Sequence, residues 1–307
     1  MRTRLTADDP ACPESLHPLL LGARPPVLTV SRPLALAGSA GTAPRAVAII
    51  GARKASAEAI DVTMKLAALV VAAGGVVLSG GALGVDKAAH EGALAAGGVT
   101  WCVAPCAPDD VTPDVHKQLF KDIEASAGGM LWTLPEGTPS SRAQFHIRNS
   151  VLVALADLVI VAQAGGGQSG SVSAARKALR LGRSVRVVRP AGWSDGFEGS
   201  RLLIRTTRVT PLESLHEMRA LLGLPPLPEE RDSEPDVDEG QAQLSFDLSE
   251  DQANLFQRMT QSPQHVDEIA HSAGIRPGQA ATLLLTLALE NVVVEGPSGF
   301  FRRQQLL

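Results

Sequence analysis

Three turns rich in glycine and serine, all between residues 47 and 190, have the composition of an anion-binding site. They read Gly51-Ala-Arg-Lys54, Ser79-Gly-Gly-Ala-Leu-Gly84 and Gly165-Gly-Gly-Gln-Ser-Gly-Ser171. Each turn follows a short apolar run and opens a helical pattern. The carboxyl ends of parallel strands lie along one edge of a sheet, where backbone N–H groups and helix N-termini favour anions. With Arg53 at its mouth, such a site should bind phosphate.

Four side chains near these turns are candidates for contact with a phosphate chain. The planar guanidinium of Arg53 can bond two phosphate oxygens at once, although an ion pair with Asp86 is the alternative. Lys54 adds a second cation beside it, and Arg148 starts an apolar helical pattern from which it could reach the turns. Phe145 is the aromatic residue next to the motifs, and it either stacks on a base or belongs to the core.

A catalytic interpretation has weaker support. Asp86 and His90 are spaced i, i+4 on a predicted helix near Ser79, which resembles scattered parts of a hydrolase. Ser79, however, is not in a Gly-x-Ser-x-Gly elbow. Asp86 suits the first turn of a helix and His90 suits a packed position. The sequence has no cluster of metal ligands, so neither a metal nor a cofactor is expected.

The composition indicates a cytoplasmic protein with two folded parts. Hydrophobic residues make up 45% of 307 residues, and no apolar run reaches the roughly 18 residues of a membrane span. Three cysteines, an odd number without zinc spacing, suit a reducing compartment. The net charge of −4 hides an asymmetry, because residues 225–247 hold eight acids and one arginine, a net of −7. The rest of the chain is therefore at +3, which permits a basic groove.

The periodicity divides the chain into an irregular, Pro-rich extension (1–44), an α/β domain (45–223), an acidic Pro-rich linker (224–245) and a small domain (246–307). The extension is expected to pack on the α/β domain through Val27–Val30. The α/β domain alternates strands and helices, as in a doubly wound, mostly parallel, Rossmann-like sheet. Its predicted strands are 46–50, 76–79, 99–104, 130–133, 158–162 and 184–188. Its predicted helices are 57–73, 86–96, 114–126, 144–156 and 171–181.

The last 62 residues (246–307) have the pattern of a winged helix: helices at 248–259, 266–273 and 278–289, then a hairpin at 292–303. The third helix has Arg276 and Gln279 at its start but is otherwise nearly free of cations. A helix that reads duplex DNA normally presents polar residues to the bases. A contact with protein or an auxiliary contact with DNA is favoured over sequence-specific binding.

The three turns, in this order, resemble the DNA-processing protein A family, also called Smf. The resemblance rests on Ala48-Ile-Ile-Gly-Ala-Arg-Lys54, on Val77-Leu-Ser-Gly-Gly-Ala-Leu-Gly-Val-Asp-Lys-Ala-Ala-His-Glu-Gly-Ala-Leu94, and on Phe145-His-Ile-Arg-Asn149 with Ser169-Gly-Ser171. It covers about 45–205. The chain departs from the family pattern at four positions, two of which lack a usual basic residue: Ala52, Leu83, His146 and Ser150.

The resemblance implies a homodimeric Rossmann-like domain that binds single-stranded DNA and loads RecA recombinase in natural transformation. The residues expected at the DNA, from the turns and from the resemblance together, are Gly51, Arg53, Lys54, Ser79, Gly80, Gly81, Phe145, Arg148, Asn149, Ser169, Gly170, Ser171 and Arg176.

Two alternatives remain. Phosphoribohydrolases of the lysine-decarboxylase-like group use a similar layer, with a Pro-Gly-Gly-x-Gly-Thr-x-x-Glu motif, but the matching stretch here (164–176) has no such glutamate. A winged-helix transcription regulator with a ligand-sensing α/β domain is disfavoured by the apolar third helix.

Overall fold

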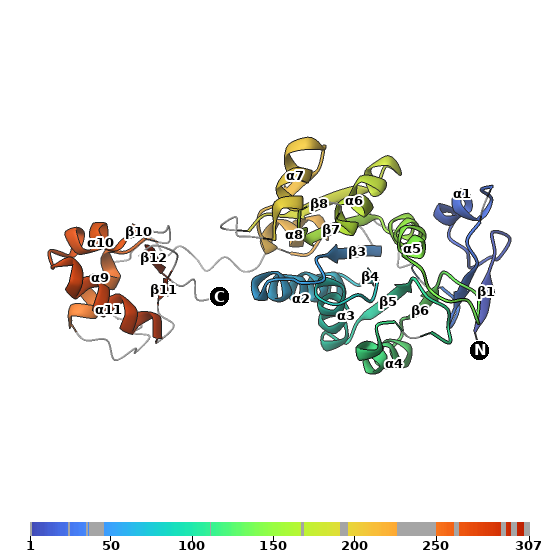
Figure 1. Ribbon diagram of the computed structural model, residues 1–307, viewed down its shortest axis with the longest axis horizontal. Coiled ribbons are helices and arrows are strands. Elements are labelled where there is room, and N and C mark those ends of the chain that lie inside the picture. Colours follow the sequence, from blue (N-terminus) through green and yellow to red (C-terminus); the bar gives the residue numbers. More distant parts are fainter. Residues whose placement is uncertain are drawn as a thin grey trace. The chain divides into compact units, whose positions relative to one another are not determined.

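The computed structural model describes residues 2–23, 25–34, 36, 46–110, 112–166, 169–190, 196–225, 250–260, 264–289, 293–295 and 300–303. The chain forms two compact units, Met1–Arg231 and Asp232–Leu307 (Figure 1). Most of the predicted acidic linker, from residue 226 onward, lies outside the described residues.

The larger unit is built on a nine-stranded sheet with the order β1-β2-β6-β5-β4-β3-β7-β8-β9. The seven strands from β6 to β9 in this order are parallel, whereas β1 and β2 are antiparallel to their neighbours. The strands are β1 (Thr3–Leu5), β2 (Leu28–Val30), β3 (Ala46–Gly51), β4 (Val76–Ser79), β5 (Val99–Ala104), β6 (Gly129–Trp132), β7 (Leu158–Gln163), β8 (Ser184–Val188) and β9 (Thr210–Leu212). The prediction of a mostly parallel α/β sheet is confirmed.

The central strands are almost entirely apolar because helices cover both of their faces. All six residues of β7 are buried, and so are Ala46–Ile50 of β3. A strand that is exposed on one face would instead alternate apolar and polar residues. Alternate residues of β3 contribute to two separate cores, with Val47 and Ile49 in one and Ala48 and Ile50 in the other.

The helices divide between the two faces of this sheet. On one face α5, α6 and α7 pack in sequence, and η1 packs against α5; on the other, α4, α3, α2 and α8 pack in sequence (Figure 1). Their bounds are η1 (Glu14–Leu16), α1 (His17–Leu20), α2 (Ala57–Ala72), α3 (Val85–Ala95), η2 (Asp114–His116), α4 (Lys117–Ala125), α5 (Arg142–Leu155), α6 (Gly170–Arg180), α7 (Glu198–Thr206) and α8 (Leu215–Leu221).

The prediction of an irregular N-terminal extension was wrong. β1 and β2 form an antiparallel pair, and Thr29 and Val30 of β2 pair with Trp132 and Leu131 of β6. The expected packing through Val27–Val30 is confirmed, since Leu28 and Val30 are buried. Strands of three residues are too short to show an alternating pattern, and for this reason the sequence did not reveal them. α7, β9 and α8 were also not predicted.

The smaller unit has the winged-helix pattern expected from the sequence. It contains α9 (Glu250–Arg258), β10 (Gln264–His265), α10 (Val266–Ala273), α11 (Pro277–Leu289), β11 (Val293–Glu295) and β12 (Phe300–Arg303). The strands form a sheet with the order β10-β12-β11, of which β10 was not predicted. Leu284 and Leu287 are fully buried in its core, so the apolar third helix serves packing.

Candidate nucleic-acid interface

The three glycine-rich turns meet at one edge of the sheet, as predicted. They follow β3, β4 and β7, which are neighbours in the sheet. Beside them is a pocket of about 360 Å³. Fifteen residues line it: Ile50, Gly51, Ala52, Arg53, Ala82, Asp86, Phe145, Arg148, Asn149, Gly165, Gly166, Ser169, Gly170, Ser171 and Ala174. A Cβ at Gly51 would come within 2.5 Å of Val85 Cγ2. The close approach of this turn to α3 therefore requires glycine at position 51.

Arg53 is exposed at the mouth of the pocket, and Phe145 holds it there. The Arg53 guanidinium lies over the Phe145 ring, 4.8 Å from its centroid, and Arg148 lies 6.0 Å from the same centroid. A cation above an aromatic face is stabilised by about 0.5–1 kcal/mol at an exposed site. Phe145 is half-buried, so its ring is neither a fully buried core residue nor fully exposed for stacking on a base. One face of the ring already carries Arg53.

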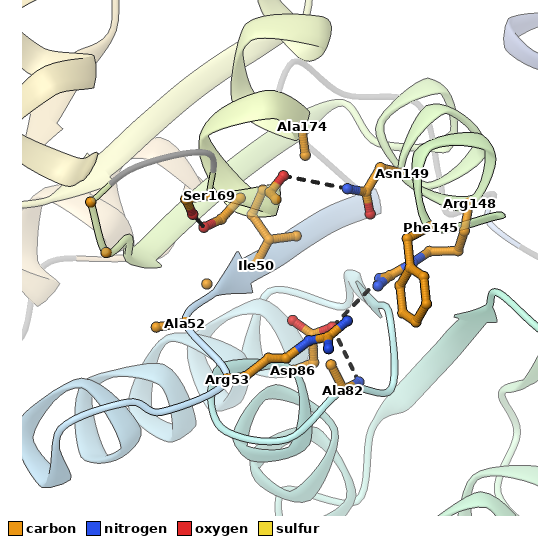
Figure 2. Close-up of a pocket in the computed structure, with 15 residues that line it drawn as sticks. Ile50, Ala52, Arg53, Ala82, Asp86, Phe145, Arg148, Asn149, Ser169 and Ala174 are labelled. Carbon is orange, nitrogen blue, oxygen red and sulfur yellow. Dashed lines mark hydrogen bonds and ion pairs between the residues drawn. The ribbon is translucent and has the colours of Figure 1, made fainter. Parts of the chain in front are cut away.

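Arg148 is a buried cation paired with a buried carboxylate. Its Nη1 lies 3.5 Å from Asp86 Oδ2, and each side chain is only 7% exposed. Asp86 also accepts the backbone N–H of Ala82 at 3.3 Å. Gly80 makes room for this pair, because a Cβ at this position would collide with the Arg148 guanidinium. Figure 2 shows Arg148 reaching from α5 toward Asp86, with Arg53 extending from the turn after β3 toward the same place. The alternative pairing of Arg53 with Asp86 was wrong.

The N-terminus of α6 forms the opposite wall of the pocket. The hydroxyls of Ser169 and Ser171 are 2.8 Å apart, and Asn149 Nδ2 donates to the Gly170 carbonyl at 3.3 Å (Figure 2). The Ser169 side chain caps none of the helix N–H groups. A helix N-terminus with free N–H groups favours an anion.

A second, smaller hollow of about 100 Å³ lies beside the pocket and shares Arg53, Phe145 and Arg148 with it. Gly80 and Gly81 line this hollow, and Leu83, which replaces a basic residue of the family pattern, is 46% exposed at its edge. Together with Ala82, the three shared side chains line both hollows and therefore lie between them.

Three of the predicted DNA-contacting residues line neither of the two hollows. Ser79 is fully buried and donates its hydroxyl to the Ile49 carbonyl at 2.7 Å, so its predicted contact with DNA was wrong. A small polar residue at a strand end looks the same in sequence whether it faces the ligand or the core. Lys54 and Arg176 are exposed but do not line the pocket.

Glu198 is a site residue that sequence reasoning missed. Its carboxylate accepts the backbone N–H of Gly196 at 3.0 Å and that of Gly166 at 3.1 Å. These hydrogen bonds, that from Gly196 first, hold the pKa of the carboxyl below its usual range. An acidic side chain thus occupies one N–H group of the third turn. Its position 32 residues beyond Gly166 gave no sequence motif that links the two.

Behind the second turn lies a buried cluster of imidazoles and thiols. Thr100 donates its hydroxyl to the Val77 carbonyl at 3.0 Å, so it accepts from Nδ1 of His90 at 2.7 Å. Burial, with His116 and Arg148 nearby, lowers the pKa of His90 to about 3. Burial also raises the pKa of Cys102, and that of Cys106 to about 11.

This geometry defines a class of site: a pocket with two arginines and a helix N-terminus at the carboxyl edge of a Rossmann-like sheet. Residues 3–222 match the family model described as DNA recombination-mediator protein A, and residues 239–299 match that of the DprA winged helix domain. The chain belongs to the DNA recombination-mediator protein A family.

Relatives and solved structures agree with this family. The chain is 32% identical to the putative DNA processing protein DprA of Mycobacterium tuberculosis over 77% of its length, and 30% identical to protein Smf of Escherichia coli over 74%. Each alignment spans 59% of the relative.

A structure of DNA processing protein A from Helicobacter pylori, described for its single-stranded DNA binding mode, matches with a TM-score of 0.58 and 27% identity over 73% of this chain and 96% of that one. The structure of DprA from Streptococcus pneumoniae matches with a TM-score of 0.59 and 26% sequence identity. This match covers 71% of this chain and 73% of that one.

Among the described residues, no helix is both long and apolar enough to cross a membrane.

Proposed function

We propose that the chain binds single-stranded DNA in the pocket between α5 and α6, and that it acts without catalysis as a recombination mediator. The observation that carries the proposal is the pair Arg53 and Arg148, which face one hollow from opposite sides beside the N-terminus of α6. Two guanidinium groups and free helix N–H groups suit a chain of phosphates. A binder that tolerates any sequence needs backbone contacts of this kind rather than base readout.

The proposed DNA-contacting residues are those of the predicted set that line the two hollows. Arg53 and Arg148 supply charge, Ser169, Gly170 and Ser171 supply N–H and hydroxyl donors, and Asn149 braces the helix start. The family supports the further proposal that the chain protects incoming DNA, forms a homodimer and loads RecA recombinase during natural transformation. The winged helix would then contact protein or duplex DNA as an auxiliary module.

The alternative of a nucleotide-processing enzyme has less support. Asp86 is the one carboxylate among the described residues that line the pocket, and it is paired with Arg148. A general acid or base must exchange a proton with the substrate, which a carboxylate held by a buried guanidinium does poorly. Ser79 is buried and bonded to the backbone, so it is unavailable as a nucleophile.

The test is the salt dependence of oligonucleotide binding by the full chain and its Arg53→Ala variant. Arg53 is exposed, so its removal should leave folding intact. We expect weaker binding to any sequence and a salt slope reduced by about 0.7 for each lost phosphate contact. Lys121→Ala removes an exposed cation from α4, on the opposite face of the sheet, and is the matched control. If both variants bind like the wild type, the pocket assignment is wrong; hydrolysis of a nucleotide would support the enzyme instead.

A further inference from the structure

The two helical faces of the sheet differ strongly in charge. Residues 170–183 and 196–208, which are α6, α7 and the short segments that adjoin them, hold seven basic residues and one acid, Glu198. On the opposite face α2, α3, α4 and α8 hold seven acids and five basic residues. The asymmetry is invisible in the net charge of −4. It indicates that the α6–α7 face attracts a polyanion.

Five of these seven cations are free to bind a ligand: Arg176, Lys177, Arg180, Arg205 and Arg208, which we call the basic strip. Within the described part of the chain none of them forms an ion pair with an acidic side chain. All are exposed except Lys177, which is half-buried. Of the other two, Arg183 donates to the Ala154 carbonyl, and Arg201 is not counted as free.

Arg176 and Arg180 of the basic strip lie on the helix whose first turn lines the pocket, on the side of that helix that faces α7. Gly170, Ser171 and Ala174 of α6 line the pocket, and Arg176 and Arg180 follow on the same helix. Val172 faces α7, because a Cβ at Gly199 would come within 2.8 Å of it. Arg176 and Arg180 lie four and eight residues after Val172, so they follow the same side of α6 along α7. Glu198, tied to the N–H groups of Gly166 and Gly196, lies at the pocket end.

We infer that a single DNA strand leaves the pocket over the start of α6 and runs along the basic strip, which binds its phosphates. The inference rests on the proposed function, because the strip alone does not select a strand. From Gly170 to Arg180 the helix rises by about 15 Å. This length corresponds to about four phosphates at a spacing of roughly 3.4 Å, and to fewer in an extended strand.

The test compares a short oligonucleotide of about four nucleotides with a long one of about 16, spanning the range of known single-strand site sizes. The variant is R176A/R180A and the control is K65A/K121A, which removes two cations from α2 and α4. We expect the variant to bind the short strand like the wild type. For the long strand its salt slope should fall by about 1.4, so that its affinity deficit shrinks about seven-fold between 50 and 200 mM salt.

The proposal for the basic strip would be overturned if R176A/R180A lost affinity equally for the short and the long oligonucleotide. It would also be overturned if this variant bound the long oligonucleotide like the wild type. The proposal would also fail if the control K65A/K121A lost as much affinity for the long oligonucleotide as R176A/R180A. Arg53→Ala separates the two proposals, since it should weaken both lengths. If Arg53→Ala weakens binding of neither oligonucleotide while R176A/R180A weakens binding of the long one, the pocket assignment is wrong and the basic strip is supported. Thermal unfolding of each variant shows whether a loss reflects folding.

Discussion

Replacing Asp86 with asparagine removes the charge that neutralises Arg148 while nearly preserving its shape. Both side chains are 7% exposed, so the guanidinium would remain buried without a counter-charge. Breaking a buried ion pair from one side costs about 3–5 kcal/mol. For a domain of this size each kcal/mol shifts the melting temperature by about 2–4 °C, so we expect a decrease of about 6–20 °C.

The same change should strengthen DNA binding. In the wild type the Asp86 carboxylate repels any phosphate that approaches Arg148. If a phosphate lies about 6 Å from this carboxylate, the repulsion is about 0.7–3 kcal/mol for effective dielectric constants between 80 and 20. Asp86→Asn should therefore raise the affinity for a single strand roughly three- to hundred-fold. Stability and affinity would change in opposite directions, which a general loss of folding cannot produce.

The assays are thermal unfolding and fluorescence anisotropy with a labelled oligonucleotide, the latter well below the melting temperature of the variant. The double variant D86N/R148M is the control, because it also removes the uncompensated cation. It should recover much of the lost stability and lose the gain in affinity. A single variant Asp86→Asn that melts like the wild type, or that binds DNA more weakly, would refute this reasoning.

Three further predictions concern residues around the pocket. Gly80→Ala should displace the Arg148 guanidinium and flatten the salt slope by about 0.7; an unchanged slope would mean that Arg148 does not contact phosphate. The pKa of His90 is lowered to about 3, so its neutral form stabilises the fold above the unfolded pKa near 6.5. This contribution should be lost as the pH falls from there toward 3, by up to about 1.4 kcal/mol per unit, and His90→Asn should show a flatter acid unfolding curve. Cys106, with a pKa of about 11, is thiolate in about one molecule in a thousand at pH 8, so Cys106 and Cys102 should react with an aromatic disulfide only on unfolding.

The sequence predicts much of the sheet because its central strands carry an unusually clear pattern. Leu158–Gln163 is apolar up to its last residue, and a strand that is covered on both faces has this composition. The three turns follow such strands, so their meeting at one edge requires only that the strands are parallel and adjacent. Arg53 could therefore be placed at this edge before any coordinates, whereas Arg148 and Asn149 were placed there by the family resemblance.

The contacts of individual side chains, such as ion pairs between distant residues, could not be predicted. Arg148 and Asp86 are 62 residues apart, and Asp86 is closer in sequence to Arg53, with which it does not pair. Ser79 ends a strand, and a shift of one residue along a strand turns a side chain from one face to the other. Its position in the core therefore depends on register, which the pattern of a four-residue strand does not determine.

Net charge is a poor guide to the ligand of this chain because opposite charges are separated in sequence and by topology. Eight acids fall within residues 225–247, outside the α/β layer, while α6 and α7 carry five basic residues and one acid. The strands β7, β8 and β9 follow one another across the sheet, so the two right-handed crossovers between them place α6 and α7 side by side on one face. A mononucleotide could satisfy the two pocket arginines. It could not use Arg180, three turns further along the helix, whereas a continuous strand can.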